Sequence, residues 1–373
     1  MGMDYKQCVE FLRKYASPAE LRDLMRTAST TFSYKHTKIF LTYYSMPDWL
    51  AIMDTAAVPG AAVPGAEPFG DVLRAMSVES TRPAVGAFII DNSIESSVRK
   101  GAFRHLVEAY KSAAKEHQKS VADCLNGFIG RGSGRALLME LGRTRHTITV
   151  MPHWHYFMTM PGGHGFYNAI TLALLPGQRL FHVTDGVRNN LKDSFAKGVP
   201  LRGEDEVLAG GTGTGAGANA IIFFSAGTFT DTVYTGVSTN EPPDEVLFHE
   251  LAHATRTIRG IETHIPVEGR PNFGNIEEYF ATVITNIYTS EKGKDDQLRG
   301  VYAPGKANPP KDWSVMQDPD SFYDNVDKVS MPPDDLMDMF KRTQPHFYQA
   351  LAHLPTPPRF NPARIHFKQA CPV

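Results

Sequence analysis

The sequence predicts an α+β fold with a mostly helical N-terminal region, because helices and strands occur in blocks rather than in regular alternation. Residues 3–28 and 98–128 carry apolar side chains at the spacing of amphipathic helices. Residues 146–152 alternate and are β-branched, and residues 220–225 form a short apolar run, so both segments indicate strands. The 373-residue chain is 42% hydrophobic and 21% charged, which is typical of globular proteins and sufficient for a large core.

The pattern changes after residue 128, so we expect two regions. Residues 1–128 form the helical N-terminal region, whose role the sequence does not indicate. Residues 129–373 form the second region, and its first predicted element is a short helix over 136–144. Within it, residues 152–208 are rich in Gly, Pro and His and predict an irregular insertion.

The C-terminal half predicts three further helices, over residues 242–259, 275–290 and 334–352, followed by an extended, proline-rich tail after Pro355. The stretch "GGTGTGAGAN" (210–219) lacks the Gly-Lys-Ser/Thr of a phosphate-binding loop, and a strand rather than a helix follows it. It therefore predicts a flexible turn or a lid.

The composition excludes several classes of function. The net charge is -2 and the pI is about 6.7, so the chain lacks the basic excess of a nucleic-acid binder or a membrane-surface protein. Cys8, Cys124 and Cys371 are too few and too scattered for a disulfide framework or a cysteine metal site. We expect neither a cleaved secretory signal nor a membrane span, because no apolar run is long enough.

The segment "DEVLFHELAHATRTIRG" (244–260) contains His-Glu-x-x-His on a helix with clear ends. Pro242 and Pro243 suit the first helical positions, and Gly260 suits a C-terminal stop. His249 and His253 are four residues apart, so both imidazoles lie on one face and can bind one metal ion.

Glu250 is offset by about 100° of helix rotation, which places its carboxylate beside the ion, where a general base is needed. The flanking residues are apolar almost all round, so the helix should be buried. Two buried histidines and a buried glutamate need partners, and Zn²⁺ supplies them.

A catalytic zinc takes three protein ligands. The extended His-Glu-x-x-His-x-x-Gly-x-x-His pattern is absent, because Arg256 and Arg259 stand where its Gly and His would be. The other common plan takes a glutamate from a later helix, and "GNIEEYFATVITNIY" (274–288) offers Glu277 and Glu278.

Glu278 is the favoured third ligand. It shares with Thr282 a face of small side chains that could pack closely against the motif helix, whereas Glu277 lies at the margin of the apolar stripe. A capping box with Asn275 is the alternative role of Glu278. His264, on the connecting loop, is the remaining candidate ligand.

"VLFHELAHATR" followed by "NIEEYFATVITNIYTSE" resembles the gluzincin-type zinc metalloproteases, and most closely the M91-type bacterial effector proteases, the family of the NleD effector. The third-ligand helix is also similar to that of anthrax lethal factor, in which the glutamate before an aromatic-aromatic-Ala run binds zinc. That glutamate corresponds to Glu278. The resemblance covers about 130–151 and 209–303.

The sequence departs from these relatives at two places: Thr282 stands where many carry an acid, and Pro271 stands where a tyrosine is expected. The residue that stabilises the oxyanion is therefore open, with Tyr288 and Tyr302 as candidates.

The resemblance implies a zincin-like metalloprotease domain over 129–373 and a zinc-dependent endopeptidase that acts on a protein or peptide substrate. His249, His253 and Glu278 would bind the metal, and Glu250 would be the general base. The resemblance also implies a bacterial effector or toxin, secreted without a cleaved signal peptide through contact with a secretion-system component or chaperone, and active in the cytoplasm of a target cell.

Three alternatives stay open at this point. The chain could be a zinc hydrolase of another class, such as an aminopeptidase or an amidase acting on cell-wall peptides. It could be a non-catalytic module with a structural zinc. Its few cysteines also suit an ordinary cytoplasmic protein.

Overall fold

A computed structural model provides the fold. It describes residues 5–26, 29–32, 38–50, 96–152, 169–174, 207–208, 212–213, 215–226, 242–263, 265–267, 273–299, 316–317, 319–326 and 330–370. The architecture is mixed helix and sheet, as the sequence predicts.

The main sheet has five strands in the order β1-β2-β3-β7-β4. Their bounds are Ser29–Phe32 for β1, Ile39–Thr42 for β2, Ile148–Met151 for β3, Ile170–Leu174 for β4 and Asn219–Phe223 for β7. The strands β2, β3 and β7 are parallel to one another, whereas β1 and β4 run antiparallel to their neighbours. The predicted strands 146–152 and 220–225 are thus confirmed as β3 and β7 at the centre of the sheet.

The N-terminal helices are α1 (Tyr5–Tyr15), α2 (Pro18–Met25) and α6 (Ser96–Ile129), which confirms the helices predicted over 3–28 and 98–128. The break between the first two is a capping box, in which Ser17 and Glu20 satisfy each other's backbone N–H groups. Phe11 of α1 packs edge-on against Phe103 of α6.

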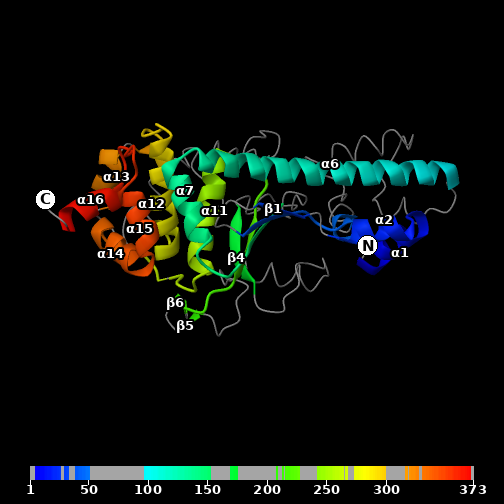
Figure 1. The fold of residues 1–373 in the computed structure, drawn as a ribbon, viewed down its shortest axis with the longest axis horizontal. Coiled ribbons are helices and arrows are strands. Elements are labelled where there is room, and N and C mark those ends of the chain that lie inside the picture. The colour runs from blue at the N-terminus through cyan, green and yellow to red at the C-terminus, as the bar shows by residue number, and fades with distance from the viewer. Residues whose placement is uncertain are drawn as a thin grey trace.

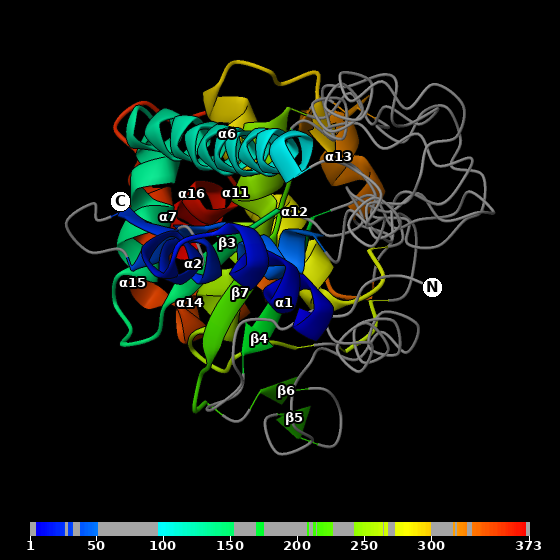
Figure 2. The same ribbon diagram turned by 90° about the vertical axis from the view of Figure 1, so that its right-hand side faces the viewer.

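In Figure 1 the long helix α6 runs from α1 and α2 at one end of the molecule toward the C-terminal helices at the other. The helices α11 (Pro243–Thr257) and α12 (Ile276–Glu291) lie between the sheet and those C-terminal helices. Figure 2 looks along the long axis and shows β3, β7 and β4 side by side. Since α11 packs against β7 and the edge strand β4, the histidine motif lies directly beside the sheet.

The core crosses the boundary expected at residue 128. Strand β2 of the N-terminal region pairs with β3 of the second region, and Ile39 and Leu41 of β2 belong to the same buried cluster as Leu247 and Phe248 of α11. The helix α7 (Gly132–Leu141) follows α6 almost immediately and packs against both α6 and α11. The N-terminal region therefore supplies part of the framework that supports the motif helix.

The C-terminal segment differs from the sequence prediction. The helix predicted over 334–352 is two helices, α14 (Pro333–Thr343) and α15 (Pro345–Ala352), because Pro345 forces Gln344 out of helical geometry. The tail predicted to be extended contains the helix α16 (Pro362–Ala370). Its start is encoded by Asn361, whose side chain accepts the N–H of Arg364.

The remaining elements are short: β5 (Val207–Leu208), β6 (Thr212–Gly213), β8 (Leu298–Arg299), β9 (Met316–Gln317) and α13 (Pro319–Val326). Within the described part of the chain, no helix combines the length and the apolar character needed to cross a membrane.

The sequence predicts a flexible turn or a lid for the glycine-rich segment, of which the structure describes residues 212–213 and 215–219. It lies against the C-terminal end of α11, and Gly213, Gly215 and Ala218 donate backbone hydrogen bonds to Glu262, Gly260 and Thr257. The backbones approach so closely that a Cβ on Gly217 would lie 2.2 Å from the carbonyl oxygen of Ile258. Glycine is needed here because two backbone segments pack directly on each other.

Gly217→Ala should destabilise the fold by roughly 2–3 kcal/mol, because the new Cβ clashes with Ile258 and the φ of +69° is strained for a residue with a side chain. Gly215→Ala is the matched control, since its φ is +85° but nothing lies within 4 Å of its Cβ. That variant should lose only about 1–2 kcal/mol. Urea unfolding of the two variants checks the difference, and equal losses would contradict the packing argument.

Candidate metal centre

The motif helix α11 has the ends that the sequence predicts. Pro243 occupies the first turn, and Asp244 and Glu245 place negative charge at the positive end of the helix dipole. Lys292 at the end of α12 binds both carboxylates, at 2.6 Å from Asp244 and 2.8 Å from Glu245. Gly260 adopts a φ of +65°, which ends the helical segment in a left-handed turn. These contacts fix the position of the helix that carries the histidines.

The second helix of the site, α12, begins at a side-chain cap. Asn275 accepts the backbone N–H of Glu278 at 3.0 Å. The side chain of Glu278 does not complete a capping box with Asn275, because it points to the histidines of α11. The cap and the candidate ligand are therefore neighbours on the first turn of one helix.

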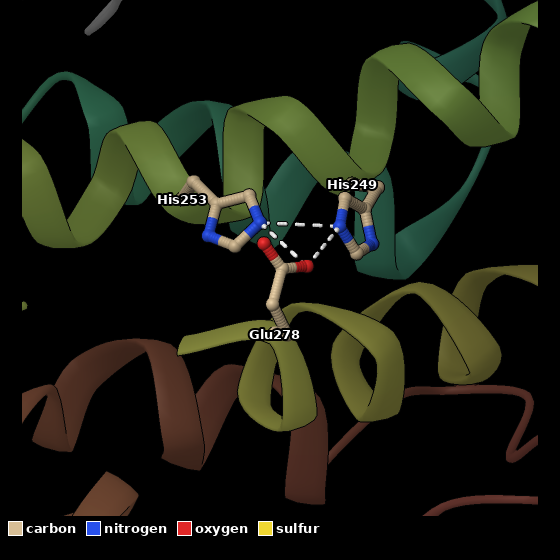
Figure 3. Close-up of side chains that lie close together, drawn as sticks. All are labelled: His249, His253 and Glu278. Atoms are coloured by element: carbon tan, nitrogen blue, oxygen red, sulfur yellow. Dashed lines mark hydrogen bonds and ion pairs between the residues drawn. The ribbon is translucent and has the colours of Figure 1, made fainter. Parts of the chain in front are cut away.

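The structure brings His249, His253 and Glu278 together, as Figure 3 shows. The Nε2 atoms of the two histidines lie 3.1 Å apart. Glu278 Oε2 lies 3.3 Å from Nε2 of His249 and 3.5 Å from Nε2 of His253. Three ligand atoms from two helices thus form a small triangle, and this group could hold a metal ion.

The size of the triangle suits a small cation with nitrogen and oxygen ligands. Around a tetrahedral Zn²⁺ with bonds of about 2.0–2.1 Å, two ligand atoms lie about 3.3–3.4 Å apart. The three separations, from 3.1 to 3.5 Å, bracket that value. The donor set also fits, because two imidazole nitrogens and one carboxylate oxygen are ligands that Zn²⁺ takes in proteins.

The three side chains of the triangle are mostly buried. The side chain of His249 is 6% exposed, whereas those of His253 and Glu278 are 14% and 20% exposed.

Burial and mutual charge together set the protonation of these groups. Burial lowers the pKa of His249 to about 4, although a hydrogen bond with Glu278 partly opposes this. Burial also lowers the pKa of His253, but the charge of Glu278, with a smaller contribution from Glu250, outweighs it and raises the value to about 9. Burial raises the pKa of Glu278, yet the two histidines hold it well below its usual range. Glu278 is therefore an anion, as a metal ligand must be.

Glu250 lies next to the triangle and is held from the sheet. Thr171 on the edge strand β4 places its hydroxyl 2.7 Å from the Oε2 atom of Glu250 and 2.9 Å from its backbone oxygen. Burial raises the pKa of Glu250 to about 7, while the charge of His253 and the hydrogen bond from Thr171 oppose the rise. Glu250 is thus a buried carboxyl group whose orientation Thr171 fixes.

Glu277 has a different partner. Its carboxylate accepts hydrogen bonds from Nε of Arg256, at 2.7 and 2.8 Å, and from the backbone N–H of Thr263 at 2.5 Å. These contacts turn Glu277 away from the histidines, so the alternative third ligand is engaged in an ion pair.

The other candidates are not brought to the triangle. Tyr288, one of the two candidates for the oxyanion donor, donates its hydroxyl to Asp244 at 2.8 Å, and its ring stacks on Phe248. Tyr302 and His264 lie outside the described residues.

Sequence reasoning missed two residues of the site. Thr171 belongs to "AITLALL" (169–175), whose β-branched and apolar residues indicate a strand, but the segment lies within the stretch predicted to be irregular. Arg256 enters the sequence argument only as a departure from the longer histidine motif. A cation on a buried helix needs a carboxylate, and that need would have pointed to Glu277.

Comparison with known proteins adds no relative: no family model, no curated protein and no solved structure matches this chain. The function of the protein is therefore inferred from its sequence and from the geometry of the site.

Proposed function

We propose that this protein is a zinc-dependent endopeptidase with a zincin-like catalytic domain, in which His249, His253 and Glu278 bind the metal. The observation that carries the proposal is the triangle of three ligand atoms with separations of 3.1–3.5 Å, adjacent to a buried carboxylate. The described part of the chain supplies three ligands, the number typical of catalytic zinc, whereas structural zinc usually takes four. The sequence resemblance to effector proteases supports a bacterial effector or toxin whose substrates are target-cell proteins.

The chain's own residues account for the proton transfers. A bound Zn²⁺ would supply Lewis acidity at the triangle, for a water molecule and for the substrate carbonyl. Glu250 would take a proton from the attacking water as general base and then give it to the leaving amine as general acid. Thr171 would hold the carboxylate in place by donating to one of its oxygens, which leaves the other oxygen for the proton. A cation in the triangle would also lower the pKa of Glu250 from its value near 7 and favour the basic form.

The test is a map of new N-termini in cell lysates treated with the wild-type protein or with Glu250→Gln. We expect internal cuts at a limited set of sequences with the wild type and none with the variant. Trimmed termini alone would indicate an aminopeptidase, and cuts confined to cell-wall peptides would indicate an amidase. Bound zinc without any cut in any of these substrates would indicate a structural site.

Thr171→Val should lower kcat/KM roughly 10–100-fold, because the isosteric side chain cannot donate to Glu250 and the carboxylate loses its fixed orientation. Thr171→Ser keeps the hydroxyl and should retain most of the activity. Initial rates on a cleaved peptide check both, together with zinc content, which should stay the same. Full activity in the valine variant would show that Thr171 does not position Glu250.

A further inference from the structure

A buried ion pair joins the two helices of the metal centre. The side chain of Arg256, on α11, is 0% exposed, and that of Glu277, on α12, is 3% exposed. Nε of Arg256 lies 2.7 and 2.8 Å from the two carboxylate oxygens, and its guanidinium lies over the ring of Phe280 at 4.6 Å. The pair is therefore enclosed by protein on both sides.

The pair also fixes the connection between the helices. Nη2 of Arg256 donates to the carbonyl oxygen of Ile261 at 2.7 Å. The backbone N–H of Thr263 donates to Glu277 at 2.5 Å. One guanidinium and one carboxylate thus tie α11, the segment after it and the start of α12 into one unit.

Burying two charges is a poor way to gain stability, because their desolvation offsets most of their attraction. An apolar pair of the same size would pack the two helices equally well. This ion pair restricts the relative position of the two helices, since Nε of Arg256 is shared between both oxygens of Glu277 while Nη2 is held by Ile261.

The two residues of the ion pair are close in the sequence to the candidate metal ligands. Arg256 follows His253 by three residues, and Glu277 immediately precedes Glu278. Adjacent side chains on a helix point about 100° apart, so Glu277 can be anchored on Arg256 while Glu278 faces the histidines.

We propose that Arg256 and Glu277 are positioning residues, which set the rotation and height of α12 against α11 so that Glu278 meets His249 and His253 in a geometry suited to a metal ion. This inference shares with the proposed function only the requirement that the triangle binds a metal ion. It does not require that the protein cleave peptides.

The same two helices carry a second ion pair that serves as a control. Lys292, which directly follows α12, binds Glu245 of α11 at 2.8 Å, near the opposite ends of both helices. Removing only Arg256 or only Glu277 would leave a buried charge and could prevent folding. The informative variants are therefore two matched double substitutions, Arg256→Met with Glu277→Gln and Lys292→Met with Glu245→Gln. The side-chain oxygen that Glu277→Gln retains would still accept the N–H of Thr263.

The experiment titrates each metal-free protein with Co²⁺ and records the affinity and the visible absorption of the bound ion, with circular dichroism to verify the fold. We expect the wild type to bind one Co²⁺. The Arg256/Glu277 variant should bind it roughly 10–100-fold more weakly, with an altered spectrum. The Lys292/Glu245 variant should keep the wild-type spectrum and an affinity within about twofold.

Wild-type affinity and spectrum in a folded Arg256/Glu277 variant would overturn the positioning role alone. Equal weakening in both variants would also overturn it, since general packing would then be the cause. If the Arg256/Glu277 variant fails to fold while the control folds, the pair supports the fold as a whole and the proposal is overturned. Metal binding without peptide cleavage would overturn the proposed endopeptidase but not this inference, and failure of the wild type to bind Co²⁺ would overturn both.

Discussion

Glu250→Gln should abolish peptide hydrolysis, by about 10²–10⁴-fold in kcat, while leaving the metal content unchanged. Gln has the shape of Glu and can still accept the hydrogen bond from Thr171, but it cannot take a proton from water. Glu250 is also not one of the three residues whose ligand atoms meet in the triangle, so the loss of its charge should not release the ion.

Zinc content and initial rates on the same protein sample check this expectation. Glu245→Gln is a control from the same helix, because that residue is also a buried glutamate but binds Lys292 at 2.8 Å instead of lying beside the triangle. It should retain most of the activity. If the Glu250 variant keeps more than about a tenth of the wild-type rate, Glu250 is not the general base.

The sequence was informative wherever the controlling signals are local. The helix α11 could be placed because Pro243, the acidic first turn and Gly260 act within a few residues of each other. Side-chain spacing then put His249 and His253 on one face, and the structure shows their Nε2 atoms 3.1 Å apart. Glu278 was favoured over Glu277 because it shares a helix face with small side chains that allow a close approach to α11. How two helices pack on each other is only weakly encoded in such a pattern.

The sequence was less informative where contacts join distant segments. Nothing local indicates that Ile39 and Leu41 pair with a strand more than 100 residues later, because parallel pairing needs a long crossover. The composition of the glycine-rich segment predicts flexibility. In the structure, Gly213 and Gly217 are required by the backbone of α11's C-terminal turn, a partner that composition cannot identify.

Two features were predicted wrongly although the sequence contains a signal for each of them. The apolar spacing over 334–352 hid the break at Gln344, although Pro345 restricts the residue before it. The short edge strand that contains Thr171 was not predicted, because the residues around it are rich in Gly, Pro and His. In both cases the average character of a segment concealed a local signal, which is a proline in the first case and a short apolar, β-branched run in the second.

Glu278→Ala should cause the largest loss of metal affinity, because it removes one of the three converging ligands and the negative charge that favours a cation between two histidines. The loss should exceed the roughly 10–100-fold that is typical for a residue acting on a ligand from outside. Glu277→Gln should stay within that smaller range if it folds, because Glu277 contacts Arg256 rather than the triangle.

Thermal unfolding with and without zinc gives an independent measure of the same site. A metal that binds only the folded state stabilises it by about 4.1 kcal/mol when the free ion is present at 1,000 times the dissociation constant. Zinc should therefore raise the Tm of the wild type by several degrees. In Glu278→Ala it should leave the Tm nearly unchanged. If Glu277→Gln lost the zinc-dependent rise in Tm while Glu278→Ala retained it, the assignment of the third ligand would be reversed, and the packing of α12 on α11 would have to differ from the one seen here.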